Sequence, residues 1–365
     1  MRVALVHDWL TGMRGGEKVL RELCSLFPES QVYTLFWEPK SVAPEIEGRI
    51  VQTSFLQHVR AFADYRNLLP FFPAAIRSLR IREADLVVSS SHAVAKGVRI
   101  PVGVPHLCYI HTPMRYLWDD TGNYFAFGRG RRWKHLALRA VTPYLKAFDR
   151  RSTVSPTKIV ANSQTVRARV RRAYGRDAEV VFPPVDVVFF SPNPAERLDD
   201  FYLTVSALEP YKRIDVALEA FRRLNRRLIV IGDGTQRAEL QSVAPANVEF
   251  IRRVSDEDLR GFYRRCRALI MPGIEDFGMT PVEAQACGRP VICYGEGGGV
   301  ETVADGRTGL HFWPQAASGL AAAVIHFESR SWDVTVIRRN TERFSADVFR
   351  RRIREIASEL GANRE

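Results

Sequence analysis

Short apolar runs alternate with amphipathic segments along almost the whole chain. In the first half the apolar runs cover residues 3–6, 32–36, 50–53, 86–89, 107–110, 159–161 and 180–182. In the second half they cover residues 202–206, 228–231, 248–251, 268–271 and 291–294. Runs of this length are typical of strands buried on both faces, and the helical patterns between them supply crossover connections. The pattern predicts an α/β protein with two Rossmann-like parallel-sheet units in series.

Prolines mark the expected boundary between the two units. Residues 182–186 read Phe-Pro-Pro-Val-Asp and residues 191–194 read Ser-Pro-Asn-Pro, and proline interrupts both helices and sheets. We therefore expect a first domain at residues 1–185 and a second at 186–345. Residues 346–365 carry a last helical pattern, which could pack on either domain and so cross back to the first.

Composition and charge narrow the function classes. The chain has 365 residues, of which 46% are hydrophobic, so it is folded and neither disordered nor fibrous. The formal charge of +12 lies in the first half, because residues 1–185 carry 28 basic and 15 acidic side chains against 25 and 26 in residues 186–365. Such a half suits an anionic membrane or nucleic acid, although the 46 arginines against 7 lysines also fit a codon-biased genome. No base-stacking motif or recognition helix is visible, so we expect no nucleic-acid partner.

The sequence shows no secretory signal, because residues 1–8 run directly into a strand pattern. The charge-free stretch 308–327 has the length of a membrane span, but it contains proline, glutamine, serine and two histidines, and we interpret it as a loop and a helix. Five scattered cysteines in apolar surroundings indicate buried reduced thiols of a cytoplasmic protein, without the spacing of metal ligands. They are Cys24, Cys108, Cys266, Cys287 and Cys293.

A glycine-rich turn follows the first strand. After His7-Asp8-Trp9 the chain continues through Gly12-Met13-Arg14-Gly15-Gly16-Glu17 into a helical pattern. Backbone N–H groups of Gly15 and Gly16 at a helix N-terminus favour an anion such as phosphate. The spacing is neither that of a Walker A loop nor Gly-x-Gly-x-x-Gly, which argues against a dinucleotide oxidoreductase.

Two adjacent cations follow the first strand of the second half. The strand ends at Ser206 and leads to Lys212 and Arg213, at the end of a parallel strand where open α/β sheets bind ligands. Lys212 is the only lysine in residues 186–365. Since lysine binds phosphate as a compact charge, we expect the phosphates of a nucleotide there; the alternative is an exposed lysine kept by chance.

Two glutamates flank a glycine turn after a later strand. Glu275 and Glu283 are separated by seven residues, with the turn Phe277-Gly278-Met279-Thr280 between them. Residues 280–283 also fit a capping box with Pro281 at the first helical position, so Glu283 could serve only as a cap. That alternative leaves Glu275 unexplained. Amides turned toward an anion, beside carboxylates suited to sugar hydroxyls, indicate a nucleotide-sugar site.

Together these motifs resemble a family-4 retaining glycosyltransferase of GT-B fold, over nearly the whole chain. The resemblance rests on the Glu-x7-Glu motif, the Pro-Tyr-Lys-Arg-Ile-Asp segment at 210–215, the opening His-Asp-Trp-Leu with Gly-Gly-Glu-Lys, Gly297–Glu301 and Asp305–Gly309. Residues 109–116, Tyr-Ile-His-Thr-Pro-Met-Arg-Tyr, are similar to a segment of bacterial mannosyltransferases of polysaccharide and O-antigen assembly. The resemblance implies two Rossmann-like domains facing a cleft.

The resemblance also implies roles for individual residues. His111, Glu275 and Lys212 would be catalytic: His111 facing the donor sugar, Glu275 binding the transferred sugar, and Lys212 neutralising the diphosphate. The expected donor-binding residues are Gly15, Gly16, Ser206, Arg213, Phe277, Gly278, Met279, Thr280 and Glu283, with Glu283 on the ribose. Where many relatives carry an arginine five residues before the lysine this chain has Ala207, and Arg213 would substitute. No Asp-x-Asp motif is present, which is consistent with a reaction that needs neither metal nor cofactor.

The expected reaction is transfer of a hexose, mannose from GDP-mannose, to a polyprenyl-diphosphate-linked saccharide. A UDP-sugar donor in the same fold and a GT-B nucleotide-sugar epimerase remain the alternatives. Basic and aromatic residues of the first half favour peripheral attachment to the inner face of the cytoplasmic membrane. They are Phe55, Phe62, Tyr65, Phe71 and Phe72, with Arg60, Arg66, Arg77, Arg80 and the cluster 129–134.

Overall fold

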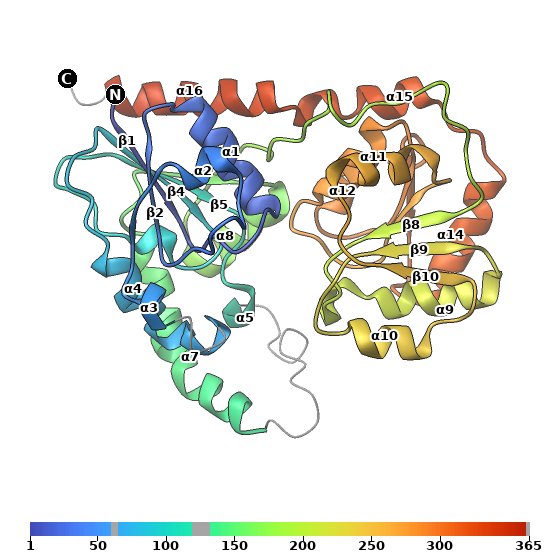
Figure 1. Cartoon of the computed structure of the whole chain (residues 1–365), viewed down its shortest axis with the longest axis horizontal. Coiled ribbons are helices and arrows are strands. Elements are labelled where there is room, and N and C mark those ends of the chain that lie inside the picture. Colours follow the sequence, from blue (N-terminus) through green and yellow to red (C-terminus); the bar gives the residue numbers. More distant parts are fainter. Residues whose placement is uncertain (60–64, 119–131, 363–365) are drawn as a thin grey trace. The chain divides into compact units, whose positions relative to one another are not determined.

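The structure, a computed structural model, describes residues 1–59, 65–118 and 132–362. The chain divides into two compact units. The first comprises Met1–Pro184 and the stretch from Asp347 onward, and the second comprises Val185–Ala346. Each unit is built on one parallel sheet with helices on both faces (Figure 1), so the predicted α/β architecture is confirmed.

The sheet of the first unit has seven parallel strands in the order β3-β2-β1-β4-β5-β6-β7. Every residue of the central strands β1, β4 and β5 is buried, which explains their continuous apolar runs. The strands are β1 (Val3–His7), β2 (Gln31–Thr34), β3 (Ile50–Thr53), β4 (Leu86–Ser91), β5 (His106–Ile110), β6 (Lys158–Ala161) and β7 (Glu179–Val180).

Alternate residues of β1 enter two separate cores, one on each face of the sheet. Val3 and Leu5 pack with α1 (Gly15–Leu26) and α16 (Ala346–Ala362). Ala4 and Val6 pack with α4 (Phe72–Ser78) and α7 (Arg132–Ser152) (Figure 1). The remaining helices of this unit are α2 (Pro44–Glu47), α3 (Leu56–Val59), α5 (Arg115–Trp118), α8 (Gln164–Tyr174) and the 3-10 turns η2 (Tyr65–Phe71) and η3 (Ala95–Gly97).

The last helix, α16, packs on the first unit. Its buried residues Phe349, Ile353, Ile356, Ala357 and Leu360 recur with helical spacing and form one apolar face. Ion pairs fix the two edges of that face: Arg350 bonds Glu22 of α1 at 2.6 Å, and Arg352 bonds Glu179 of β7 at 2.5 Å.

The sheet of the second unit has six parallel strands in the order β10-β9-β8-β11-β12-β13. Its strands are β8 (Tyr202–Val205), β9 (Leu228–Ile231), β10 (Val248–Ile251), β11 (Leu269–Met271), β12 (Val291–Tyr294) and β13 (Gly309–Phe312). Helices α9 and α14 pack on one face, and α11 and α12 on the other. The helical elements are η4 (Pro210–Lys212), α9 (Ile214–Leu224), α10 (Arg237–Val243), α11 (Asp256–Arg265), α12 (Met279–Ala286), α13 (Gly299–Thr302), α14 (Ala317–Glu328), α15 (Val334–Arg339) and η5 (Glu342–Phe344).

The stretch 308–327 is only partly as expected. Its second part is a helix, α14, but its first part is the edge strand β13 and not a loop. The first residue of β13, Gly309, has to be a glycine, because a Cβ there would lie 1.9 Å from the carbonyl oxygen of Val291 on the neighbouring strand. In the described part of the chain, no helix combines the length and the apolar character needed to cross a bilayer.

All five cysteines are buried and free, as expected. Burial raises the pKa of each thiol well above its ordinary value. Buried thiols with raised pKa values carry little thiolate and are chemically inert.

Candidate active site

The first unit gathers polar side chains where β1, β4 and β5 end. His7 is the last residue of β1 and pairs in register with Ser90 of β4. His111 follows β5, and its backbone N–H bonds the carbonyl of Ser91 at 2.9 Å. Because the three strands are neighbours in a parallel sheet, their carboxyl ends meet at one edge.

The hydroxyl of Ser90 lies between two imidazoles. Its Oγ is 3.1 Å from His7 Nδ1 and 2.8 Å from His111 Nε2. A third imidazole, that of His92, has its ring centre 5.8 Å from His7 and 6.2 Å from His111. Burial is the main cause that lowers the pKa of each of the three rings to about 3. All three are therefore neutral at pH 7.

The carboxylate of Asp8 holds the turn that carries His92. It accepts backbone N–H bonds from His92 and Ala93 at 2.7 and 2.9 Å, and from Val94 and Ala95 at 2.6 and 2.7 Å. Four amide donors satisfy a fully buried carboxylate without a cation. Asp8 thus fixes the end of β4 to the end of β1.

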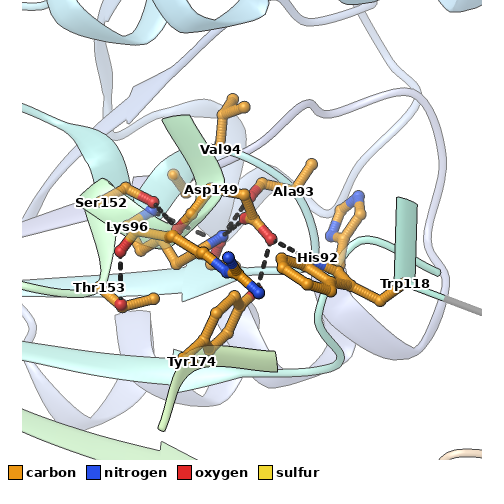
Figure 2. A network of polar contacts seen from close by, with 12 residues as sticks. His92, Ala93, Val94, Lys96, Trp118, Asp149, Ser152, Thr153 and Tyr174 are labelled. Carbon is orange, nitrogen blue, oxygen red and sulfur yellow. Dashed lines mark hydrogen bonds and ion pairs between the residues drawn. The ribbon is translucent and has the colours of Figure 1, made fainter. Parts of the chain in front are cut away.

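A buried ion pair between Lys96 and Asp149 is hydrogen-bonded to the same turn (Figure 2). Lys96 Nζ lies 2.6 Å from the carbonyl of Ala93 and 2.5 Å from Asp149 Oδ1 on α7. The second carboxylate oxygen, Oδ2, accepts bonds from Trp118 Nε1 at 2.6 Å and the Tyr174 hydroxyl at 2.8 Å. Three helices of the first unit are therefore tied to the histidine cluster through one turn.

Gly15 and Gly16 begin α1, as the sequence predicts. The backbone N–H of Arg14, the N-cap residue, bonds the Glu17 side chain at 3.0 Å. A Cβ on Gly16 would lie 3.4 Å from His7 Cε1 and 3.7 Å from His111 Nε2. The helix N-terminus thus lies beside the histidine cluster, within one side-chain atom of His7 and His111.

In the second unit, Lys212 and Glu275 form an ion pair. Lys212 ends η4, which follows β8, and Glu275 follows β11, the neighbour of β8 in the sheet. The two side chains are 13% and 19% exposed, so solvent reaches both. Gly273 permits this approach, because a Cβ there would lie 2.7 Å from the Lys212 backbone.

Ser206 and Arg213 also follow the carboxyl end of β8, but the hydrogen bonds of their side chains go to other partners. Arg213 has a left-handed backbone with φ of 53°, and its guanidinium bonds Asp215 through Nε and Nη2, both at 3.0 Å. Its Nη1 lies 3.5 Å from the side-chain oxygen of Gln315. The Ser206 hydroxyl bonds the carbonyl of Ala207 at 3.1 Å.

The turn between the two glutamates is held by backbone bonds. The carbonyl of Glu275 accepts the N–H of Gly298 at 2.8 Å, and Gly278 supplies the left-handed N-cap of α12 with φ of 89°. Met279 and Thr280 form the partly exposed first turn of that helix. The side chain of Phe277 is buried against Phe344, with ring centres 5.4 Å apart, and anchors the turn.

The capping box expected at residues 280–283 is wrong. Helix α12 begins at Met279, with Gly278 as N-cap and no side-chain cap, so Pro281 lies inside the first turn. Glu283 is buried, and its carboxylate accepts the hydroxyl of Tyr263 at 2.9 Å. The Glu283 side chain is thus held by Tyr263 of α11.

Two family models match consecutive parts of the chain. Glycosyltransferase Family 4 matches residues 13–189, and Glycosyl transferases group 1 matches residues 190–343. The chain is therefore built from the two domains of a family-4, group-1 glycosyltransferase.

Curated glycosyltransferases resemble parts of the chain. An uncharacterised glycosyltransferase of Methanocaldococcus jannaschii is 29% identical over 168 residues, which cover 45% of this chain and 47% of the relative. A GDP-mannose-dependent alpha-(1-6)-phosphatidylinositol monomannoside mannosyltransferase of Mycolicibacterium smegmatis is 32% identical over 177 residues, which cover 40% and 46%. The chain spans about half the length of the curated relatives it matches.

Solved glycosyltransferase structures share the fold at low identity. Anabaena HepE in complex with UDP has a TM-score of 0.73 at 16% identity, covering 98% of this chain and 100% of HepE. Sucrose-phosphate synthase of Thermosynechococcus elongatus has a TM-score of 0.73 at 17% identity, covering 100% of both chains. The predicted GT-B class, with two Rossmann-like parallel-sheet domains, is confirmed.

Several residues of the histidine cluster, and the partner of Glu283, are not predicted from the sequence. The sequence marks His7 and Asp8 as the end of the first strand and as part of the His-Asp-Trp-Leu segment that carries the resemblance, without a role for either side chain, and it does not single out Ser90 or His92. The run Ser-Ser-Ser-His at 89–92, directly after an apolar strand, was the available signal. Tyr263, the partner of Glu283, stands in an ordinary amphipathic helix and gave no signal at all.

Proposed function

We propose that the chain is a metal-independent retaining hexosyltransferase, which moves mannose from GDP-mannose to a polyprenyl-diphosphate-linked saccharide in surface polysaccharide synthesis. The observation that carries the proposal is the Lys212–Glu275 ion pair beside the first turn of α12. It puts a cation, a carboxylate and backbone amides at the carboxyl ends of neighbouring parallel strands, where open α/β sheets bind ligands.

The charge changes of the reaction explain why these groups are needed. Cleavage of the bond between the anomeric carbon and the diphosphate places negative charge on the leaving oxygen. Lys212 is already oriented by Glu275, and a cation held in advance stabilises developing charge without reorganisation. Departing phosphate would then accept the acceptor's proton on the same face of the sugar, which retains the anomeric configuration.

Glu275 serves in this proposal as a ligand of the transferred sugar. An ionised carboxylate can accept hydrogen bonds from two hydroxyls. When donor binds, the diphosphate would replace the Glu275 carboxylate in part of its contact with Lys212. Glu283, fixed by Tyr263, would receive the ribose, and Gly15, Gly16 and His111 of the first unit are assigned to the donor by resemblance.

The donor is best tested with a panel of nucleotide sugars. We expect hydrolysis and transfer with GDP-mannose, in line with the name of the Mycolicibacterium relative. A UDP-sugar is the second candidate, because solved HepE complexes contain UDP and UDP-glucose. Turnover of UDP-sugars alone would overturn mannose, and an isomerised sugar formed without acceptor would indicate an epimerase.

The site assignment is tested by removing single carboxylates. Glu275→Ala should lower kcat/KM by about 10²-fold or more, since groups aimed at the reacting centre contribute this much. Glu249→Ala is the matched control, because it removes a carboxylate on β10 that pairs only with exposed Arg227 at 3.0 Å in the described contacts. Full transfer activity in Glu275→Ala would refute the assignment.

We further propose that the first unit attaches to an anionic membrane surface. Phe55 and Phe71 are 45% and 56% exposed, and Arg77 and Arg80 are exposed near them in the chain. Phe72, which the sequence suggested for this surface, is 2% exposed and belongs to the core. Arg60, Phe62, the side chains of Tyr65 and Arg66, and the cluster 129–134 lie outside the described side chains.

Sedimentation with vesicles tests the attachment. The protein should sediment with phosphatidylglycerol-containing vesicles at low salt, and less so at high salt, because exposed charges are screened. Phe71→Ser with Arg77→Gln should reduce the bound fraction, whereas neutral phosphatidylcholine vesicles provide the control. Equal binding to both vesicle types, or none at low salt, would contradict the proposal.

A further inference from the structure

The hydrogen bonds around Ser90 restrict which nitrogen of His111 carries a proton. The hydroxyl has one proton to donate, and it contacts His7 Nδ1 and His111 Nε2 at the same time. Both rings are neutral at pH 7, because burial keeps their pKa values near 3. Each ring therefore has one N–H and one bare nitrogen.

Two arrangements use the Ser90 hydroxyl fully. In the first, His7 Nδ1–H donates to Ser90, whose hydroxyl donates to His111 Nε2. In the second, His111 Nε2–H donates to Ser90, whose hydroxyl donates to His7 Nδ1, and His7 then carries its proton on Nε2. If both rings instead donated to Ser90, both lone pairs of its oxygen would be used and the hydroxyl proton would need a third acceptor, which the contacts of the described residues do not supply. The tautomers of the two histidines are thus coupled through one oxygen.

The surroundings of His7 select between these arrangements. His7 is fully buried, and among the described residues its Nε2 has no hydrogen-bond partner. The neighbouring carboxylate of Asp8 is occupied by four backbone amides. A buried N–H without an acceptor is rarer in proteins than an unused acceptor, so Nε2 is the bare nitrogen of His7. The proton of His7 is then on Nδ1.

We propose that His7 and Ser90 are positioning residues that hold His111 as its Nδ1–H tautomer. The relay runs from His7 Nδ1–H through the Ser90 hydroxyl to the lone pair of His111 Nε2. It fixes the rotation of the His111 ring, which stands 3.7 Å from the place of a Cβ on Gly16. It also leaves Nδ1–H as the single proton that the ring can donate. The catalytic consequence, though not the tautomer, rests on the proposed glycosyl transfer.

The tautomer can be measured directly in the full-length protein. Long-range ¹H–¹⁵N correlation spectra of ¹⁵N-histidine-labelled protein distinguish protonated from bare ring nitrogens, and His111→Gln assigns the signals. We expect His111 as Nδ1–H at pH 7. Observation of the Nε2–H form, or of rapid averaging of both forms, would overturn the relay.

Neighbouring serines provide a matched pair of variants. Ser89 precedes Ser90 in β4 and bonds a different buried imidazole, His106 Nε2, at 2.7 Å. Ser90→Ala should shift the His111 spectrum and leave His106 unchanged, and Ser89→Ala should do the reverse. An unchanged His111 spectrum in Ser90→Ala would show that Ser90 does not set the tautomer.

Conservative replacements separate the relay from simple packing. Asn at position 7 can place an N–H donor near the position of His7 Nδ1, whereas Phe fills the volume without a donor. His7→Asn and Ser90→Thr should keep the His111 spectrum, and His7→Phe should change it. The same spectrum in His7→Phe as in the wild type would exclude His7 from the relay.

Activity provides a separate readout. In Ser90→Ala, kcat for transfer should fall about 10-fold, the lower end of the range for groups that orient metal-bound imidazoles, with the KM for the donor little changed. Ser90→Thr should restore it. A wild-type protein with the Nδ1–H form but no transfer would refute the proposed function alone. Transfer with His111 in the Nε2–H form would refute the relay alone.

Discussion

Removal of the Lys96 ammonium should destabilise the first unit strongly. Lys96 and Asp149 are 2% and 0% exposed, and their side chains meet at 2.5 Å (Figure 2). In Lys96→Met, Asp149 keeps its bonds from Trp118 and Tyr174 but loses its counter-charge. Breaking a buried ion pair from one side costs about 3–5 kcal/mol, because an uncompensated charge stays buried.

A second substitution should recover much of that loss. Asparagine at position 149 retains a side-chain oxygen for Trp118 and Tyr174 and carries no charge. The double variant Lys96→Met with Asp149→Asn should therefore be about 2 kcal/mol more stable than Lys96→Met alone. It no longer buries an unpaired charge, and its remaining loss is that the hydrogen bonds from Trp118 and Tyr174 become weaker neutral ones. The favourable coupling between the two substitutions distinguishes charge burial from lost packing.

Hydrogen exchange followed by mass spectrometry measures the loss of stability separately for each of the two units. In Lys96→Met, amides of residues 86–98 should exchange roughly 10²- to 4 × 10³-fold faster, because 3–5 kcal/mol corresponds to about 2–3.6 powers of ten at 1.4 kcal/mol each. Amides of residues 202–208 in the second unit are the internal control and should not change. A cost below about 1 kcal/mol in the single variant, or no recovery in the double variant, would refute the reasoning.

Three further predictions concern glycines and histidines. Gly16→Ala should fold normally, since the nearest atom to the new Cβ is 3.4 Å away, but calorimetry should show weaker nucleotide binding if α1 receives the phosphate. Gly298→Ala should lower transfer, because its Cβ would lie 2.2 Å from the carbonyl of Phe277 and displace the Glu275 turn; unchanged kinetics would contradict this. Burial lowers the pKa of His7, His92, His106 and His111 to about 3. Between pH 6.5 and 3 these four histidines therefore take up protons in the unfolded chain only. The stabilisation that these neutral histidines give to the first unit is fully present above pH 6.5. Below that pH the free energy of unfolding of the unit should fall by about 1.4 kcal/mol per histidine for each pH unit. Urea titrations at pH 7 and pH 5.5 that coincide would exclude this.

The sequence by itself determined the fold class and every strand from β1 to β12. The central strands are apolar over their full length because helices cover both faces of each sheet, and a buried run of that kind is visible without tertiary information. The edge strand β13 was missed, because His311 and the glycine at its start weaken the apolar pattern.

The sequence also located Lys212, Glu275 and the Gly15-Gly16 turn at strand ends, since the end of a parallel strand can be read from the pattern. Only the tertiary structure decided which of these groups meet. Lys212 pairs with Glu275, Arg213 turns to Asp215, and Glu283 bonds Tyr263. These contacts join residues 63, 2 and 20 positions apart.

The histidine cluster shows the same division most clearly. His7 and Ser90 belong to two strands and His111 follows a third; they are 83 and 21 positions apart along the chain, and no local pattern connects them. Strand order and register bring them together, because β1, β4 and β5 are adjacent and parallel. Side-chain hydrogen bonds depend on distances of a few tenths of an ångström, which long-range packing sets and sequence periodicity does not encode.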